Sequence, residues 1–138
     1  MEPIELIEAK EIDYLFVQQS QLINAGQGLF TAIDIYKNEL IATFKGKILT
    51  PQDANLRAQK NENHYFINMI DGRILDCMHT FCFAKFANDA AHFAISSFKN
   101  NAIITLNEDQ KVCLVATKKI KSGAEIFCSY GKAYWKNK

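Results

Sequence analysis

Two glycines one position apart mark the first segment whose backbone suits ligand binding. They lie in the run Gly26-Gln27-Gly28. Glycine has no Cβ and reaches positive φ at little cost, so the main chain can approach a ligand closely there. The run is not the dinucleotide-binding fingerprint, because Thr31 stands where a third glycine belongs and no βαβ pattern follows. A tight turn before a strand remains the alternative interpretation.

Polar side chains in the second half of the chain form a second candidate. Asn88 and Asp89 are followed, after a short interval, by Asn100 and Asn101. A side-chain amide both donates and accepts hydrogen bonds, so asparagine suits a ligand that carries both kinds of group. Asparagine and aspartate are also typical of turns and helix caps. That alternative stays open for Asn88 and Asp89.

A tyrosine near the end of the chain is the third candidate. It closes a β-like run that begins at Ile120 and ends in Tyr130-Gly131. A tyrosine at a strand end buries its ring and keeps its hydroxyl group in contact with water. Tyr130 is therefore either a polar group in a site or an ordinary core residue.

Short apolar runs bounded by turns predict the mostly β fold that would hold these candidates. The runs are rich in the β-branched and aromatic residues that strands favour, and they cover residues 15–17, 29–33, 40–44, 74–76, 102–106 and 112–116. Asp71-Gly72 and Asn107-Glu108-Asp109 are typical hairpin turns. Helix signals are fewer. Thr50, followed by Pro51, predicts a polar, partly helical insertion at about residues 50–63, and residues 79–88 are a second short candidate.

Size and charge limit the classes of function. A chain of 138 residues predicts one domain over residues 1–138. The formal net charge of +1 argues against direct nucleic-acid binding, and we interpret the basic residues near the C-terminus as solvated. No apolar run approaches the ~20 residues of a membrane span. The first ten residues do not resemble a signal peptide, so we expect an intracellular protein in the cytoplasm, with the nucleus as the alternative.

The cysteines do not have the spacing of metal ligands. The four of them form no CxxC pair, and no histidine follows at a zinc-finger distance. Cysteine without such a pattern behaves as a small apolar residue. We therefore expect Cys77, Cys82, Cys113 and Cys128 to be buried and to bind no metal.

Together and in this order, the motifs resemble those of the SET-domain protein-lysine methyltransferases. The matching segments, in chain order, are Gly-x-Gly-Leu-Phe from Gly26, Ile74-Leu75-Asp76, Lys-Phe-x-Asn ending at Asn88, Asn101-Ala102, and Gly-x-Glu-Ile from Gly123 with Tyr130-Gly131 after it. The resemblance extends over about residues 15–135. It implies a β-clip-like SET fold of several short sheets. In that fold the C-terminal segment makes a knot-like crossing beneath the loop that follows Asn88.

The resemblance also implies a cofactor and a reaction. The cofactor is S-adenosyl-L-methionine, and its methyl group is transferred to the ε-amine of a lysine in a protein substrate, with histones among the candidates. The backbone of Gly26, Gln27 and Gly28 would line the methionine part of the cofactor. Asn88 would hold its amino group, and the backbone of Asp89 would lie beside the adenine. No metal is implied.

Aromatic residues carry the catalytic roles that the resemblance implies. Tyr130 matches the tyrosine at the point of methyl transfer, and Tyr65 matches an aromatic residue of the lysine channel. Trp135 would cover the cofactor. Cys128 and Tyr134 would line the substrate channel.

The chain also departs from the family's pattern. Asp89 stands where most members have a histidine, and the cysteine-rich zinc segment that often follows the domain is missing. Tyr134 and Trp135, or a second subunit, would then close the site, so we expect a monomer or a homodimer. The alternative function is a catalytically inactive SET-like module that binds a protein or peptide.

Overall fold

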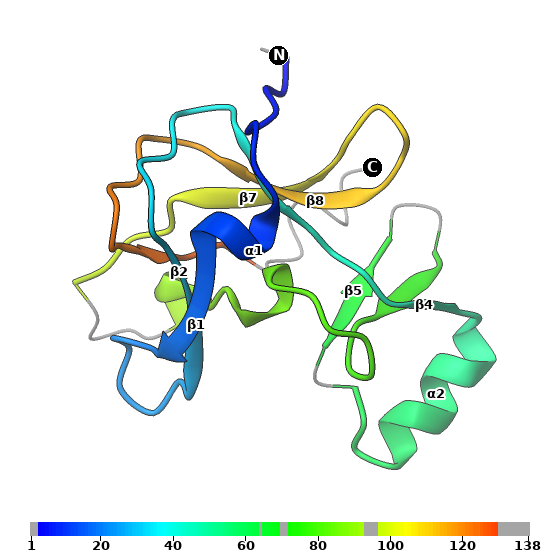
Figure 1. Ribbon diagram of the computed structural model, residues 1–138. Coiled ribbons are helices and arrows are strands. Elements are labelled where there is room, and N and C mark those ends of the chain that lie inside the picture. The colour runs from blue at the N-terminus through cyan, green and yellow to red at the C-terminus, as the bar shows by residue number, and fades with distance from the viewer. Residues whose placement is uncertain (1–2, 64, 70–71, 93–96, 130–138) are drawn as a thin grey trace.

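A computed structural model describes residues 3–63, 65–69, 72–92 and 97–129. In this part of the chain, nine short strands form three antiparallel sheets (Figure 1). The first sheet has the order β1 (Leu15–Gln19), β2 (Gln27–Thr31), β9 (Glu125–Ile126). The second has the order β3 (Leu40–Thr43), β8 (Val112–Ala116), β7 (Ala102–Leu106). The third has the order β4 (Lys47–Leu49), β6 (Ile74–Asp76), β5 (Phe66–Asn68).

Helices contribute little to the described structure. The helical elements are α1 (Glu11–Tyr14), α2 (Pro51–Gln59) and two 3-10 turns, η1 (Ala84–Phe86) and η2 (Ala90–His92). None of the helices in the described ranges has the length and apolar character needed to cross a bilayer. The expected mostly β fold is therefore confirmed.

The three sheets share one main core. Leu29 of β2, Ile41 of β3, Leu114 of β8 and Ile126 of β9 are fully buried in it. All five residues of β8 are buried, because this strand lies between β3 and β7 and is covered on both faces. A continuous apolar run is the sequence pattern of a strand in such a position.

The end of the described chain lies between two segments that are distant in sequence. Phe127 bridges to Asn88, and Cys128 bridges to Ala102, both in the parallel direction. The Cys128 N–H donates to the Asn88 carbonyl at 2.9 Å, and the Ala102 N–H donates to the Phe127 carbonyl at 3.0 Å. These contacts place the C-terminal segment between the two ends of the loop beneath which it is expected to cross.

The polar insertion contains α2 at its start. Thr50 caps the helix, because its hydroxyl group accepts a hydrogen bond from the Asp53 N–H at 3.2 Å. One ion pair joins the helix to the third sheet, with Arg57 Nη1 2.6 Å from Asp76 Oδ2. The Asp76 carboxylate is almost wholly buried, and its other oxygen accepts from the Met78 N–H. Figure 1 shows α2 on the outer side of the third sheet, away from β1 and β2.

The second helix candidate, residues 79–88, was wrong except for the short turn η1. Near the start of this segment, a lysine side chain forms hydrogen bonds to backbone carbonyl groups. Lys85 Nζ donates to the carbonyl groups of Cys77, Met78 and Thr80 at 3.1, 3.3 and 3.1 Å. One ammonium group thus satisfies three carbonyls, and the Cys77 carbonyl also accepts from the Thr80 N–H at 3.4 Å.

Candidate functional site

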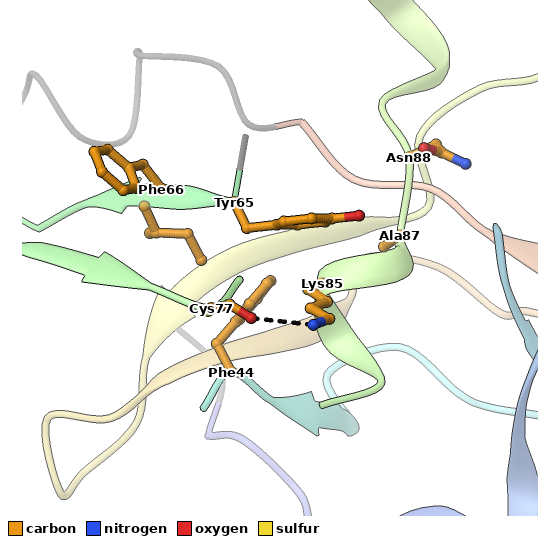
Figure 2. Close-up of a pocket in the computed structure, with 8 residues that line it drawn as sticks. Phe44, Tyr65, Phe66, Cys77, Lys85, Ala87 and Asn88 are labelled. Atoms are coloured by element: carbon orange, nitrogen blue, oxygen red, sulfur yellow. Dashed lines mark hydrogen bonds between the residues drawn. The ribbon is translucent and has the colours of Figure 1, made fainter. Parts of the chain in front are cut away.

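A pocket of about 320 Å³ lies where residues from the second and third sheets meet the η1 segment (Figure 2). Phe44 follows β3, Tyr65 precedes β5, and Cys77 follows β6. The full lining is Phe44, Tyr65, Phe66, Ile67, Cys77, Lys85, Ala87 and Asn88. The pocket therefore brings together two of the residues expected in the site, Tyr65 and Asn88, which belong to different motifs.

Tyr65 forms an aromatic wall of this pocket. Figure 2 shows its ring lying across the pocket, with its hydroxyl group directed toward the Ala87–Asn88 segment. Its carbonyl group accepts from the Cys77 N–H at 3.2 Å, which ties the start of β5 to the end of β6. The Lys85 ammonium lies 5.1 Å from the ring centroid, within the range of a cation–π contact. The ring is thus held at a defined place beside a fixed positive charge.

Asn88 connects the pocket to the glycine turn. Its Nδ2 donates to the Gln27 carbonyl at 2.9 Å, and its own carbonyl accepts from the Cys128 N–H. Its Oδ1 atom is an acceptor that suits a ligand with an N–H group. The glycine turn and the asparagine motif therefore lie together, although 61 positions separate Gln27 from Asn88.

The two glycines of the turn are needed for different reasons. Gly26 has φ +75°, a conformation that favours glycine, and open space surrounds the position of its missing Cβ. Gly28 lies in β2, where a Cβ would overlap the Glu125 carboxylate and lie 3.1 Å from the Ser20 Cβ. Gly26 thus sets the turn and leaves room beside it, whereas Gly28 makes room for a buried side chain.

Glu125 is a residue that the sequence analysis did not assign to the site. It is 2% exposed. Its carboxylate accepts from the Ser20 hydroxyl at 2.6 Å and from the Gln21 N–H at 2.8 Å. The one available signal was the acidic residue of Gly-x-Glu-Ile, which stands in an otherwise apolar strand. A charged residue in such a place is rarely buried without partners.

The remaining polar candidates bond mainly to one another and to the backbone. Asp89 Oδ1 accepts from Asn100 Nδ2 at 2.9 Å and from the Ala91 N–H at 3.0 Å. Asn100 Oδ1 accepts from the Ala90 N–H. Asn101 accepts from the Phe127 N–H and donates to the Glu125 carbonyl. Asn100 and Asn101 therefore hold the C-terminal segment and the Asp89 loop in place.

The cysteines are thiols and are buried, as expected. Cys77 and Cys82 form a pair beside the pocket. The Cys77 thiol donates to the Cys82 sulfur, and this hydrogen bond holds the pKa of Cys82 below its ordinary value, with the Lys45 and Lys85 N–H groups acting in the same direction against the effect of burial. The same hydrogen bond, together with burial, raises the pKa of Cys77. The described residues contain no cluster of histidine, cysteine, aspartate and glutamate that could hold a metal ion.

Several expected site residues have no described geometry in the pocket. Tyr130, Tyr134 and Trp135 lie outside the described residues. Cys128 has no exposed surface and is packed in the main core. Its place in a substrate channel stays a prediction.

The family model described as SET domain matches residues 26–131. No curated protein sequence matches this chain. Similar solved structures include two chains from the Polycomb Repressive Complex 2 of Chaetomium thermophilum, one from the complex in an autoinhibited conformation bound to S-adenosylmethionine and one from a humanized mutant bound to an inhibitor.

The structural likeness to both chains is the same. Each aligns with a TM-score of 0.69 and 22% sequence identity over 86% of this chain. At this identity the likeness shows a shared fold. The aligned part is only 15% of the length of either of those chains.

Proposed function

The chain belongs to the SET-domain family, and from this membership we propose that it is an S-adenosylmethionine-dependent protein-lysine methyltransferase. The observation that carries the proposal is the hydrogen bond from Asn88 to Gln27 beside the pocket that contains Tyr65. It joins the turn and the asparagine motif at one place, as a bound cofactor would require. The substrate in this proposal is a protein with an accessible lysine.

The residues around the glycine turn suit the cofactor. The open space beside Gly26 leaves its backbone accessible, and Asn88 Oδ1 can accept a hydrogen bond from an ammonium group. The Asp89 carboxylate oxygen Oδ1 accepts hydrogen bonds from Asn100 and from the Ala91 N–H. The backbone of Asp89, rather than its carboxylate, would therefore lie beside the adenine. When bound, S-adenosylmethionine supplies a methyl group on a positively charged sulfur.

The pocket suits a neutral amine. A lysine ammonium has a pKa of about 10.4 in water and must lose its proton before it can attack. The aromatic and aliphatic walls formed by Phe44, Tyr65 and Ile67 disfavour the charged form. The Lys85 ammonium in the pocket wall acts in the same direction, because like charges repel. No described side chain is placed as a dedicated base, so water would accept the proton.

Methyl transfer would then depend mostly on positioning. Holding reacting atoms in line accounts for roughly 7 to 11 kcal/mol of a barrier. The Tyr65 ring would orient the substrate side chain, and Tyr130 would stand at the point of transfer, as its match to the family's tyrosine implies. Hydroxyl and carbonyl oxygens near the methyl group would stabilise the charge that it carries in the transition state.

A direct assay tests this function. The purified protein is incubated with cofactor that carries an isotopic label in the methyl group, together with a cell lysate, and methylated lysines are identified by mass spectrometry. Calorimetry measures cofactor binding in parallel. We expect binding and labelled lysine with the wild type, and binding without labelled lysine with Tyr130→Phe. Binding with no labelled product from the wild type would instead favour an inactive binding module.

A further inference from the structure

The buried Glu125 carboxylate lies against the loop that leads into the glycine turn. Ser20 and Gln21, which begin that loop, both donate to it. The Ser20 hydroxyl in turn accepts from the Leu22 N–H at 3.1 Å. The Ser20 N–H donates to the Gly26 carbonyl at 2.8 Å, which closes the loop from residue 20 to residue 26. The carboxylate is therefore part of the network that fixes both ends of this loop.

The same carboxylate packs against the strand that leaves the turn. In the register of β2 and β9, Glu125 lies opposite Phe30 and Ile126 lies opposite Leu29. The Glu125 side chain reaches back along β2 to Gly28, where any larger residue would overlap it. The Glu125 side chain thus contacts both the loop that precedes the turn and Gly28, the last residue of the turn.

The turn is held from two sides. On the pocket side, Asn88 Nδ2 binds the Gln27 carbonyl. On the core side, Glu125 supports Gly28 and the loop that ends at Gly26. The two supports come from segments that the crossing brings together, because Asn88 pairs with Phe127, two residues after Glu125.

We propose that Glu125 is a positioning residue, which fixes the backbone of Gly26, Gln27 and Gly28 in the conformation that binds the cofactor. This inference rests on the proposed function, because it takes the glycine turn as the cofactor site. Glu125 is buried and does not itself reach the cofactor. Its loss should weaken cofactor binding and leave the later steps at saturating cofactor nearly unchanged.

The replacements of Glu125 differ in what they leave unpaired. Alanine leaves the buried Ser20 hydroxyl and the partly buried Gln21 N–H without their acceptor, which is a costly state. Glutamine keeps one oxygen for Gln21 and offers an N–H to Ser20, but the Ser20 hydroxyl proton then has no acceptor. The two variants should therefore form a graded series. Arg57→Ala is the matched control, because it removes the partly buried ion pair that joins α2 to the third sheet, remote from the turn.

The experiment compares these variants in the full chain. Calorimetry gives the Kd for S-adenosylmethionine, saturating kinetics give kcat, and thermal unfolding gives Tm. We expect the Kd to rise about tenfold or more in Glu125→Ala and less in Glu125→Gln, with kcat at saturating cofactor within about twofold of wild type. Arg57→Ala should lower Tm with an unchanged Kd. An unchanged Kd in folded Glu125→Ala, or an equal rise in Arg57→Ala, would overturn the inference.

Hydrogen exchange separates this inference from the proposed function. Amide exchange over residues 20–28 is measured in the absence of cofactor for the same variants. Faster exchange there in Glu125→Ala, but not in Arg57→Ala, is expected even if the wild type fails to bind S-adenosylmethionine. That failure would contradict the proposed function alone. Unchanged exchange over residues 20–28 would overturn the positioning role.

Discussion

Asn88 and Gln27, 61 positions apart, are joined by a 2.9 Å hydrogen bond from the side-chain amide of one to the backbone carbonyl of the other. This bond connects the segment after η1 to the start of β2. It also places Asn88 Oδ1 beside the glycine turn. Asn88 therefore has two separable roles. Its Nδ2 group donates to the Gln27 carbonyl, and its Oδ1 atom would accept from the cofactor.

Replacement of Asn88 separates these roles. We expect Asn88→Ala to weaken S-adenosylmethionine binding by roughly 1 to 3 kcal/mol, because both the turn and the ligand lose a polar partner. Asn88→Asp keeps an oxygen for the cofactor ammonium but cannot donate to the Gln27 carbonyl. Its affinity, measured by calorimetry, should fall between those of wild type and Asn88→Ala. Wild-type affinity in Asn88→Ala would remove Asn88 from the cofactor site.

The contact between Gly28 and Glu125 predicts non-additive effects on stability. Gly28→Ala should destabilise the protein by about 1 to 3 kcal/mol, because its Cβ overlaps a buried carboxylate that cannot move freely. In a Glu125→Ala background the overlap is absent, so the same change should cost less. Urea unfolding of both single variants and the double variant measures this coupling. Simple additivity would show that the two residues do not meet in solution.

Strands that carry their own apolar pattern were predictable from the sequence. The runs at residues 74–76, 102–106 and 112–116 have the bounds of β6, β7 and β8. By contrast, β2 extends from Gln27 to Thr31, two residues earlier than predicted. Gln27 and Gly28 pair with Gln19 and Gln18 of β1, so pairing with a neighbour outweighs the weak strand preference of glycine.

Elements that depend on distant partners were not predictable. The two residues of β9 form a strand because Glu125 and Ile126 lie opposite β2. The short strands β4 and β5 form because they pair with the two edges of β6. In the site, Asn88 and the glycine turn were identified through the resemblance of their motifs. Glu125 was not, because its partners Ser20 and Gln21 are more than 100 positions away.

The ion pair between Arg57 and Asp76 predicts how α2 is anchored. Arg57→Ala leaves the nearly buried Asp76 carboxylate without its cation. Because Arg57 is partly exposed, we expect the free energy of unfolding to fall by about 2 kcal/mol, less than for a fully buried pair. Urea unfolding measures the loss. Limited proteolysis should show faster cleavage within residues 51–59, and wild-type stability would contradict a structural role for the pair.

A buried tyrosine in the core predicts the behaviour of the protein in alkali. Tyr14 is 4% exposed, and its hydroxyl group donates to the Ile41 carbonyl at 2.7 Å. Burial raises the pKa of Tyr14 well above its ordinary value, and the negative charges of Glu11 and Glu39 act in the same direction. The phenol thus keeps its proton in the folded protein at a pH where the unfolded chain loses it.

The stabilising effect of Tyr14 should therefore be fully present below about pH 10 and decline above it, because the unfolded phenol ionises near that pH. We expect the free energy of unfolding of the wild type to fall by up to about 1.4 kcal/mol per pH unit more steeply than that of Tyr14→Phe in this range. Below about pH 10 the variant should be less stable by about 1 kcal/mol, since the Ile41 carbonyl loses its donor. Cys113, whose pKa burial raises to about 11, is present in both proteins and cancels in the difference. Urea unfolding of both proteins at several values between pH 8 and pH 11 gives the two curves, and curves that stay parallel above pH 10 would rule out a raised Tyr14 pKa.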